Sequence, residues 1–582
     1  MCGICGIIGS PSETGVIERM TRSLSHRGPD FQDTWRAPGV ELGHTRLAIL
    51  DLSAAGNQPM TLGDLTLTYN GEIYNYRELR KGLDGPFRSH GDTEVLLHLY
   101  AQHGKACVQQ LRGMFAFAVW DTRHRRLFAA RDRLGMKPFY YRVLPDGIAF
   151  ASEIKALLEL GRPAIDRLAL RDYLTYKYVP EPKTAFEGIR NLPPGHLLTW
   201  DGEVHIERYW SPSTDIQVTD FEEAVAGLDA HLTEIVPAHT LADVPVAVFL
   251  SGGIDSTTVA AHLERPRTVT LGSDVKRRDE APVARLVANH FGTDHHEEIA
   301  ASIDLDEALD VVPRVFDEPF GDSSSWATYL VSRLARKHAI VALSGEGGDE
   351  LFCGYQWYSK WLTLRPNLFR RLLARSLPPF SDGARSSQRR SSSGLEKYAA
   401  FLGPFTPYQK GLLLGPALAE EGYDDLWHFR RYWRADLEPL KRMQWADLHT
   451  YLPGDLLTKV DRASMAHSLE VRPPLLDHKL VEWALSLDTS LLRDVEGGRG
   501  KLIVRHLMQD RIPEGLFDRP KRGFNLPIRD WLRRQPHLLT SALDRLAEAG
   551  IVRPPRFANF TNEQSWTLLA LDRWLLQANY PL

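Results

Sequence analysis

The chain has 582 residues, 43% of them hydrophobic and 25% charged, with a formal net charge of −4. That length exceeds a single typical core and predicts at least two domains of a globular protein. The near balance of 70 basic and 74 acidic residues gives no electrostatic reason to bind nucleic acid or a membrane surface. No apolar run approaches the roughly 18 residues of a membrane span, and the N-terminal segment lacks the features of a secretory signal.

A cysteine stands directly behind the initiator methionine, in Met1-Cys2-Gly3-Ile4-Cys5-Gly6. Met1 is normally removed before so small a residue, which leaves Cys2 with a free α-amine beside its thiol. These groups have reference pKa values of about 8 and about 8.5, so the amine can take the thiol proton. Cys2 is therefore a candidate N-terminal nucleophile that supplies its own general base. A chance cysteine at a frayed terminus is the alternative.

Only four cysteines occur, and they are scattered along the chain. Their spacing argues against a disulfide framework or a four-cysteine zinc site, and it favours a reducing, cytoplasmic environment. The first two form a C-x-x-C pair, but the strand and helix of a redox motif do not precede it. The four are Cys2, Cys5, Cys107 and Cys353.

Short alternating strands and turns are predicted through the first two hundred residues. Strands are predicted at 3–8, 40–51, 65–70, 115–121, 126–131, 139–143 and 148–151, and helices at 15–24, 76–83 and 93–103. The last helix follows Asp92, a residue type favoured at N-caps. Many strands with few helices are typical of packed antiparallel sheets. The region ends near residues 205–220, after Pro193-Pro194-Gly195 and Trp210-Ser211-Pro212-Ser213.

From Phe221 onward the pattern changes to apolar strands that alternate with helices. Strands are predicted at 244–250, 268–271 and 340–343, and helices at 222–236, 256–263, 282–291 and 326–338. Continuous apolar strands of this kind indicate a parallel sheet that is buried on both faces. The last two hundred residues are predicted to be mostly helical, with the Ser- and Arg-rich stretch 381–393 as a solvated or mobile loop.

Two glycine-rich segments follow apolar strands of the predicted parallel sheet. In Ser251-Gly252-Gly253-Ile254-Asp255-Ser256, backbone N–H groups, hydroxyls and a helix N-terminus can cradle a phosphate. The segment lacks the lysine of a Walker-type loop, and its Asp255 is a candidate Mg²⁺ ligand. Ser344-Gly345-Glu346-Gly347-Gly348-Asp349-Glu350 also follows a strand, at the edge where open α/β sheets bind ligands. The pair resembles the pyrophosphate-loop synthetases, which cleave ATP between the α and β phosphates to adenylate a substrate.

Four N-terminal segments, taken with the cysteine nucleophile, resemble the class II glutamine amidotransferases. Hydrolysis of the glutamine amide passes through an oxyanion, which the Asn70 side chain and the Gly71 N–H are suited to stabilise. Arg46 suits the α-carboxylate of glutamine, and Asp92 and Glu72 are candidates for its α-ammonium. A surface ion pair is the alternative for Arg46 or Asp92 taken alone. The segments are His26-Arg27-Gly28-Pro29-Asp30, His44-Thr45-Arg46-Leu47-Ala48-Ile49-Leu50-Asp51, Asn70-Gly71-Glu72-Ile73-Tyr74-Asn75 and Gly91-Asp92-Thr93-Glu94.

One chain that combines these halves resembles glutamine-dependent asparagine synthetase along nearly its whole length. The resemblance implies an αββα sandwich of antiparallel sheets, of the N-terminal nucleophile type, as a glutaminase domain over residues 2–210. It implies an α/β parallel-sheet adenylating domain with a helical tail over residues 220–582. Further matching segments are Arg131-Asp132-Arg133-Leu134-Gly135-Met136-Lys137-Pro138, Ser152-Glu153-Ile154-Lys155, Lys459-Val460-Asp461-Arg462, Leu469-Glu470-Val471-Arg472, Gly500-Lys501 and Pro520-Lys521-Arg522-Gly523-Phe524.

The same resemblance implies a reaction in three parts. Cys2 releases ammonia from glutamine, ATP–Mg²⁺ activates an acceptor carboxylate as an acyl-adenylate, and ammonia crosses a dry interdomain tunnel to attack it. Glu346 is then the general base on ammonia and Lys501 a clamp on pyrophosphate, with a buried structural role as the alternative for Lys501. Small-molecule substrates are expected, and a homodimer is common in this family, although the sequence itself gives no oligomeric state. The implied ATP-binding residues are Leu250, Ser251, Gly252, Gly253, Asp255, Ser256, Ser344, Gly345 and Lys501, and the implied Mg²⁺ ligands are Asp255 and Asp349.

The acceptor site departs from the best-known asparagine synthetases. There a Thr-Thr-x-Arg segment supplies an arginine thought to bind the α-carboxylate of aspartate, whereas Ser323 stands at that position here. A serine leaves such a carboxylate poorly paired unless another residue supplies the charge. Aspartate is the expected acceptor, and another carboxylate, such as a diaminopimelate, a peptide, a sugar acid or a secondary metabolite, is the alternative. A scaffold or sensor with glutaminase activity only is a third hypothesis, which the intact candidate residues of both sites disfavour.

Overall fold

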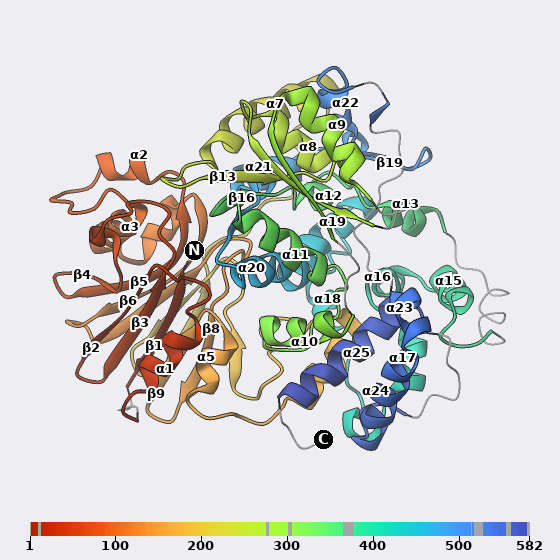
Figure 1. Ribbon diagram of the computed structural model, residues 1–582, viewed down its shortest axis with the longest axis horizontal. Coiled ribbons are helices and arrows are strands. Elements are labelled where there is room, and N and C mark those ends of the chain that lie inside the picture. Colours follow the sequence, from red (N-terminus) through yellow and green to blue (C-terminus); the bar gives the residue numbers. More distant parts are fainter. Residues whose placement is uncertain are drawn as a thin grey trace.

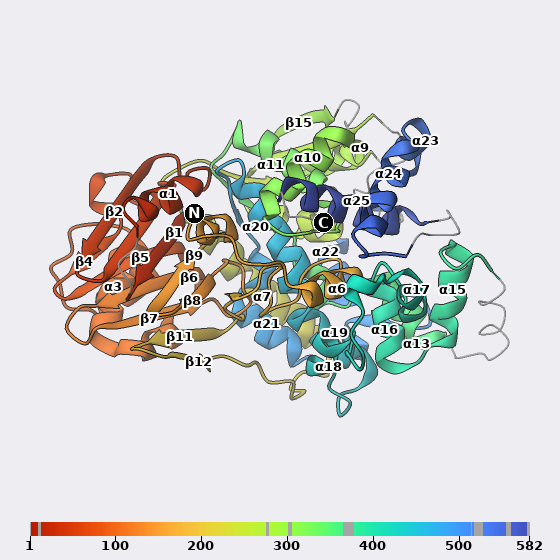
Figure 2. The ribbon, with the colours of Figure 1, turned by 90° about the horizontal axis from the view of Figure 1, so that it is seen from below.

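The computed structural model describes residues 2–9, 13–274, 279–300, 305–364, 377–513, 515–516, 528–553 and 560–578. Two antiparallel sheets make up the N-terminal part, and a parallel sheet surrounded by helices makes up the rest (Figure 1). Seen from below, the N-terminal sheets lie at one end of an elongated molecule and the C-terminal helices at the other (Figure 2). The matching segment 520–524 lies outside the described residues.

Each N-terminal sheet has six strands. The strands are β1 (Gly3–Ile8), β2 (Phe31–Ala37), β3 (Val40–Arg46), β4 (Met60–Leu62), β5 (Leu65–Ile73), β6 (Gly113–Asp121), β7 (Arg126–Arg131), β8 (Tyr140–Leu144), β9 (Gly147–Ala151), β10 (Ile189–Asn191), β11 (His196–Trp200) and β12 (Val204–Arg208). The helices are α1 (Val16–Ser23), α2 (Tyr76–Lys81), α3 (Asp92–His103), α4 (Cys107–Gln110), α5 (Ile154–Leu158) and α6 (Arg167–Tyr176). One sheet has the order β10-β8-β9-β1-β3-β2 and the other β12-β11-β7-β6-β5-β4, and neighbouring strands are antiparallel in both.

The alternating side chains of β1 explain how these layers stack. Ile4 and Ile8 lie in an apolar cluster with residues of β6 and β7, so they face the second sheet. Cys5 and Ile7 point to the other face, where they pack with residues of α1. On the second sheet, α3 packs against β5 and β6, with Leu96 in the shared cluster. The layers are therefore helix, sheet, sheet and helix, and the predicted αββα sandwich is confirmed.

Local predictions in this half are confirmed at some strands and wrong at others. The strands predicted at 3–8 and 126–131 are present to the residue as β1 and β7. The strand predicted at 40–51 ends at Arg46, whose guanidinium turns to carbonyl groups of the loop that follows. Asp92 is not the N-cap of α3, because Gly91 takes that position. Its buried carboxylate accepts hydrogen bonds from Tyr69 and Ile73 instead.

The second half is built on a five-stranded sheet in which all neighbouring strands are parallel. Its strands are β13 (Val246–Phe249), β14 (Arg267–Ser273), β15 (Asp294–Ala300), β16 (Val341–Leu343) and β17 (Glu470–Arg472). The order β15-β14-β13-β16-β17 reverses direction between β13 and β16, where doubly wound sheets bind their ligands. Strands β15 and β17 were not predicted, because β15 is rich in charged residues and β17 has only three residues.

The rest of this half is helical, as predicted. The stretch 381–393, predicted to be a loop, contains α15 (Asp382–Ser391), so that prediction is wrong. Ser381 caps this helix, and the buried Arg385 pairs with Glu563, which shows tertiary packing overriding weak local propensity. The other helices are α7 (Phe221–Ala238), α8 (Ile254–Ala261), α9 (Ala281–Phe291), α10 (Leu305–Phe316), α11 (Ser325–Arg336), α12 (Gly348–Leu351), α13 (Gln356–Thr363), α16 (Gly394–Leu402), α17 (Pro407–Leu413), α18 (Trp427–Tyr432), α19 (Pro439–His449), α20 (Thr458–Met465), α21 (His478–Leu485), α22 (Leu502–Gln509), α23 (Ile528–Arg534), α24 (His537–Glu548) and α25 (Asn562–Gln577).

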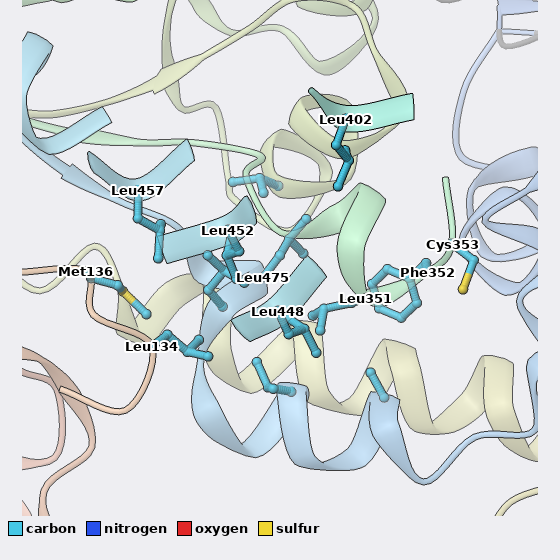
Figure 3. Close-up of a cluster of buried hydrophobic side chains, with 14 of the residues drawn as sticks. Leu134, Met136, Leu351, Phe352, Cys353, Leu402, Leu448, Leu452, Leu457 and Leu475 are labelled. Carbon is cyan, nitrogen blue, oxygen red and sulfur yellow. The ribbon is translucent and has the colours of Figure 1, made fainter. Parts of the chain in front are cut away.

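One apolar cluster crosses the boundary between the two halves. Leu134 and Met136, from the N-terminal half, belong to the same cluster as Leu448, Leu452 and Leu475 (Figure 3). Close-packed apolar side chains leave little room for water, so the halves share a dry core. Among the described residues, no helix is both long enough and apolar enough to cross a membrane.

Candidate active sites

The N-terminal half places Cys2 beside Asn70 of β5. The backbone nitrogen of Cys2 donates to Asn70 Oδ1 over 2.9 Å, and both residues are buried. Asn70 Nδ2 is buried and makes no hydrogen bond within the described residues. An unsatisfied buried donor costs about 1–3 kcal/mol, so this nitrogen is suited to an oxygen atom of a bound ligand.

The surroundings of Cys2 raise the pKa of its thiol. Burial raises the pKa of the Cys2 thiol, although the Leu47 backbone N–H and the Arg46 guanidinium act in the opposite direction. A buried thiol of raised pKa needs a nearby base to become a nucleophile. The Cys2 nitrogen, which becomes an α-amine once Met1 is removed, is on the same residue. All four cysteines lie within the described residues and are free, so the C-x-x-C pair is not a disulfide here.

Gly71 is required by the contact between two strands. It pairs with Phe115 across β5 and β6, and a Cβ atom at Gly71 would lie 2.2 Å from the Met114 carbonyl oxygen. Any larger residue would push β5 away from β6 and displace the neighbouring Asn70. The close strand contact therefore explains the Asn-Gly sequence at this position.

Arg46 lies at the end of β3 and holds the loop that follows it. Its Nη1 donates to the Ser53 carbonyl and to Asn57 Oδ1, both over 2.7 Å, and its Nη2 donates to the Leu50 carbonyl over 3.3 Å. Within the described residues, all hydrogen bonds of this guanidinium go to neutral oxygen atoms. Its positive charge is thus available to a ligand carboxylate.

The two candidate acids lie in different surroundings. Asp92 Oδ2 accepts hydrogen bonds from the Tyr69 hydroxyl (2.7 Å) and the Ile73 N–H (3.0 Å), and burial raises its pKa. Glu72 Oε2 instead accepts a hydrogen bond from Arg472 Nη2 over 2.9 Å. Burial raises the pKa of Glu72 well above its usual range, against the opposing charge of Arg472. Asp92 therefore lies with Tyr69 and Ile73 of β5, whereas Glu72 is tied to the C-terminal half.

The two glycine-rich segments meet at the reversal point of the parallel sheet. One follows β13 and the other follows β16, and these strands are neighbours. A Cβ atom at Gly345 would lie 2.8 Å from the Ser256 backbone nitrogen, so the two segments touch. Gly252 has a φ of 70°, and a Cβ there would lie 2.8 Å from Val283. Glycine at such a turn lets the backbone come close to a ligand and to the neighbouring helix, because it has no Cβ atom.

Lys501 lies between the two candidate metal ligands. Its Nζ is 2.7 Å from Asp349 Oδ1 and also bonds to Asp255 Oδ2. Asp255 Oδ1 is buried and makes no hydrogen bond within the described residues. No group of three metal-ligating side chains occurs in the described part of the chain. Two carboxylates of this kind nevertheless fit Mg²⁺, which usually takes one or two carboxylates together with substrate phosphates.

The remaining candidates of this site lie around the same sheet edge. Ser344 Oγ and Glu346 Oε2 are buried atoms without a hydrogen bond among the described residues. Leu250 is buried at the end of β13, where its N–H donates to the Val269 carbonyl over 2.9 Å. Ser251 and Ser256 are joined by their hydroxyls at 3.0 Å. The structure thus brings together Leu250, Ser251, Gly252, Gly253, Asp255, Ser256, Ser344, Gly345, Glu346, Asp349 and Lys501 at one edge.

Next to Ser323 the structure holds a buried group of charges. Lys459 Nζ donates to Asp322 Oδ2 over 3.0 Å and to Ser324 Oγ over 2.9 Å. Burial lowers the pKa of Lys459, but Asp322 and Asp455, with a smaller contribution from Glu346, raise it above its usual value. Glu346, the general-base candidate, is therefore one of the charges that raise the pKa of Lys459.

Asp455 is the unusual member of this group. It lies in a π-helical turn, Leu452–Leu457, and both carboxylate oxygens are buried without a hydrogen bond among the described residues. Burial and the neighbouring Asp322 raise the pKa of Asp455 to about 7, against the Lys177 ammonium 3.4 Å away. Such π-helical turns often occur at functional sites.

Three of these residues were not assigned a role from the sequence. They are Asp455, Lys459 and Arg472, of which the last two lie in segments that match the family. A sequence signal was present for Asp455, a charged residue inside an otherwise apolar segment, where burial demands a partner. Lys459 and Arg472 stand near other charged residues in the sequence, so their segments carried no such signal. Which partner each one meets depends on the tertiary structure.

Both halves match known families. The family model described as asparagine synthase matches residues 227–576, and the one described as a glutamine amidotransferase domain matches residues 1–210. The asparagine synthetase (glutamine-hydrolyzing) 1 of Bacillus subtilis (strain 168) is 33% identical, over 92% of this chain and 88% of its own. A putative asparagine synthetase (glutamine-hydrolyzing) of Mycobacterium bovis is 36% identical, over 92% of this chain and 88% of its own. A protein named amidase chry2 from Gibberella zeae is 28% identical, over 91% and 90%.

Proposed function

The chain belongs to the asparagine synthase family, and we propose that it is a glutamine-hydrolysing asparagine synthetase. It converts aspartate, glutamine, ATP and water into asparagine, glutamate, AMP and pyrophosphate. The glutaminase domain spans residues 2–210 and the synthetase domain residues 220–582. The observation that carries this proposal is the Lys501 ammonium between Asp255 and Asp349, at the sheet edge where a nucleotide is expected.

In the glutaminase domain, the α-amine of Cys2 takes the thiol proton as the thiolate attacks the side-chain amide of glutamine. The resulting oxyanion receives hydrogen bonds from Asn70 Nδ2 and the Gly71 N–H. Arg46 pairs with the α-carboxylate of glutamine, and Asp92 with its α-ammonium. The α-ammonium of Cys2 returns the proton to the amide nitrogen, which leaves as ammonia, and water then hydrolyses the thioester to glutamate and the free thiol. The unsatisfied Asn70 Nδ2 supports this assignment.

In the synthetase domain, the family's co-substrate ATP lies over the two glycine-rich segments. Backbone N–H groups of 251–253 and the Ser256 hydroxyl hold phosphate oxygens. Lys501 neutralises the pyrophosphate as the acceptor carboxylate attacks the α-phosphate. Mg²⁺, held by Asp255 and Asp349 with the phosphates, supplies further charge neutralisation when bound.

Ammonia then passes between the sites without exposure to water. The apolar cluster that contains Leu134 and Met136 together with Leu448 and Leu452 supports a dry path, because ammonia in water becomes ammonium and loses its nucleophilic lone pair. At the adenylate, Glu346 accepts the proton that the attacking nitrogen loses. Its buried Oε2 without a hydrogen-bond partner among the described residues supports this role.

The charges near Ser323 support aspartate as the acceptor. Aspartate carries an α-carboxylate and an α-ammonium beside the carboxylate that is activated. Lys459 supplies the cation that Ser323 does not, and Asp455 supplies an anion whose oxygen atoms accept no hydrogen bond among the described residues, with Lys177 Nζ 3.4 Å from Oδ2. A zwitterionic acceptor can pair with both residues, whereas an acceptor without an amino group leaves Asp455 with the Lys177 ammonium as its only ion-pair partner among the described residues.

Another carboxylate acceptor is the second candidate. Ser323 stands where an aspartate-binding arginine is expected, and relatives of similar coverage include proteins named amidases. A glutaminase-only scaffold is a weaker candidate, because the ATP-binding residues are all present. A homodimer and a cytoplasmic location remain predictions.

Pyrophosphate release decides between these functions. The purified protein is assayed with ATP, Mg²⁺ and ammonium, with and without L-aspartate, and the product is identified by amino-acid analysis. Aspartate-dependent pyrophosphate with asparagine as product supports the first function. No response to aspartate, with intact glutaminase activity, overturns it and directs the search to other carboxylates. Lys459→Met is expected to raise the KM for aspartate, with the half-exposed Lys479→Met as the matched control.

A further inference from the structure

Arg472 connects the two halves through its side chain. It is the last residue of β17 and is fully buried. Its Nη2 donates to Glu72 Oε2 over 2.9 Å, and its Nη1 donates to the carbonyls of His239 and Leu241 over 2.8 and 2.7 Å. Its Nε donates to Glu470 over 2.6 Å, so the fork is held at every nitrogen. This orientation is fixed as long as each partner stays in place.

The main chain of the same residue holds the second glycine-rich segment. The Arg472 carbonyl accepts a hydrogen bond from the Ser344 N–H over 3.0 Å, where β16 and β17 end side by side. Ser344 begins the segment that carries Glu346 and Asp349. A displacement of that segment therefore reaches Arg472 through one hydrogen bond.

On the glutaminase side, the contact falls next to the oxyanion donors. Glu72 follows Asn70 and Gly71 directly on β5, so a shift of its side chain bears on the backbone that carries both donors. Only one oxygen of Glu72 is bonded to Arg472, and Oε1 is buried without a hydrogen bond among the described residues. Glu72 can thus either remain hydrogen-bonded to Arg472 or turn toward the ammonium group of a ligand.

We propose that Arg472 is a positioning residue that couples the ATP site to the glutamine site. Binding of ATP orders the segment that begins at Ser344, this fixes Arg472, and Arg472 holds Glu72 and the neighbouring oxyanion donors in their productive places. The proposal rests on the proposed function, because it needs both sites to be used. The coupling is the change that one bound ligand makes in the binding free energy of the other, and it is reciprocal.

A second buried ion pair between the halves provides the matched comparison. Arg112 Nε donates to Asp477 Oδ2 over 2.7 Å. Asp477 lies five residues after Arg472 in the sequence. This pair joins the same two halves, and Arg112 also pairs with Glu234. Among the described residues, neither Arg112 nor Asp477 has a hydrogen bond or ion pair with a candidate residue of either site. Loss of Arg112 therefore reports the structural effect of breaking an interdomain ion pair, without the coupling.

The test measures alkylation of Cys2 by a diazoketone analogue of glutamine, with and without ATP–Mg²⁺. In the unmodified protein, ATP–Mg²⁺ is expected to change the alkylation rate by about fivefold or more, the lower end of typical allosteric coupling. Arg472→Gln is expected to bring the two rates to within about twofold, a coupling below that typical range. Arg112→Gln is expected to keep the unmodified ratio, with thermal unfolding followed for both variants.

Glu72→Gln is the second variant, because it removes the charge of the same contact while leaving the other bonds of Arg472 intact. Glu72→Gln is expected to bring the alkylation rates with and without ATP–Mg²⁺ together, as expected for Arg472→Gln. It therefore tests the proposal even if Arg472→Gln does not fold. An unchanged ratio in these variants, or no ATP effect in the unmodified protein, overturns the proposal. Alkylation needs no acceptor, so a failure of the proposed function shows separately, as missing pyrophosphate.

Discussion

The side-chain oxygen of Asn70 accepts a hydrogen bond from the backbone nitrogen of Cys2 over 2.9 Å, which points the other end of the amide, Nδ2, away from that nitrogen. One side chain thus both orients the group proposed as general base and presents a donor to the proposed oxyanion. Because Asn70 lies on β5 of one sheet and Cys2 directly precedes β1 of the other, the packing of the sheets determines this geometry.

Cys2→Ala is expected to abolish glutamine-dependent amidation and to leave ammonia-dependent amidation intact. The reason is that the thiol acts only on glutamine, while the adenylate forms at the edge of the parallel sheet. The measurement compares pyrophosphate release with glutamine and with ammonium as the nitrogen source. Loss of both activities in a folded variant would contradict two separate sites.

Asn70→Ala is expected to lower kcat for glutamine hydrolysis by about 10² to 10³, the usual effect of removing one oxyanion donor. The KM for glutamine should change much less, because the donor acts mainly on the oxyanion and not on bound glutamine. Glutamate release at varied glutamine measures both quantities. A rise in KM with unchanged kcat would instead make Asn70 a substrate-binding residue only.

Lys501→Met is expected to lower ammonia-dependent pyrophosphate formation by about 10² or more, because it removes the cation that faces the leaving group. Glutaminase activity should stay within a few fold. The variant leaves Asp255 and Asp349 facing each other without their ammonium, so Mg²⁺ should raise its melting temperature more than that of the unmodified protein. Equal shifts in both proteins would argue against a Mg²⁺ site at this pair.

The KM for aspartate is expected to rise as pH falls below about 7. Burial and Asp322 raise the pKa of Asp455 to about 7, and only its ionised form attracts the α-ammonium of the acceptor. At the limit, kcat/KM falls about tenfold for each pH unit below that pKa. The KM is measured from initial rates at varied aspartate between about pH 5.5 and about pH 8.5, a range that covers the titration of Asp455. Ammonium at saturating concentration is the nitrogen source.

Asp455→Asn provides the control for this pH profile. The variant should raise the KM for aspartate at all pH values and remove its rise on acidification. Ionisation of Asp455 is expected to favour aspartate binding but to lower the stability of the folded protein. A carboxyl group whose pKa is higher in the folded protein than its usual ~4 binds its proton more tightly when folded, so stability falls as pH rises from about 4 to about 7. Melting temperatures should therefore fall less steeply with pH in Asp455→Asn, and an unchanged slope would contradict the raised pKa.

Local structure was predicted correctly from the sequence where a residue type or a pattern has one main structural role. The glycines of the segments after β13 and β16 were expected to allow tight turns, and the structure shows a positive φ at Gly252 and a close contact at Gly345. The alternation of β1 predicted a strand with two faces, and both faces are used. Predictions failed where tertiary contacts outweigh local preference, as at Asp92, which faces Tyr69 and Ile73 instead of capping a helix.

The sequence by itself determined the family and predicted two domains and the candidate residues, because glycine-rich turns, hydrophobic periodicity and motif order are properties of consecutive residues. Only the tertiary structure decided which charges meet. Glu72 was assigned to glutamine but pairs with Arg472, and Lys459 was given no role but stands beside Asp322 near the acceptor position. These partners lie far apart along the chain, and burial forces each charge to find an opposite one. The partner that it finds depends on how the sheets and helices pack.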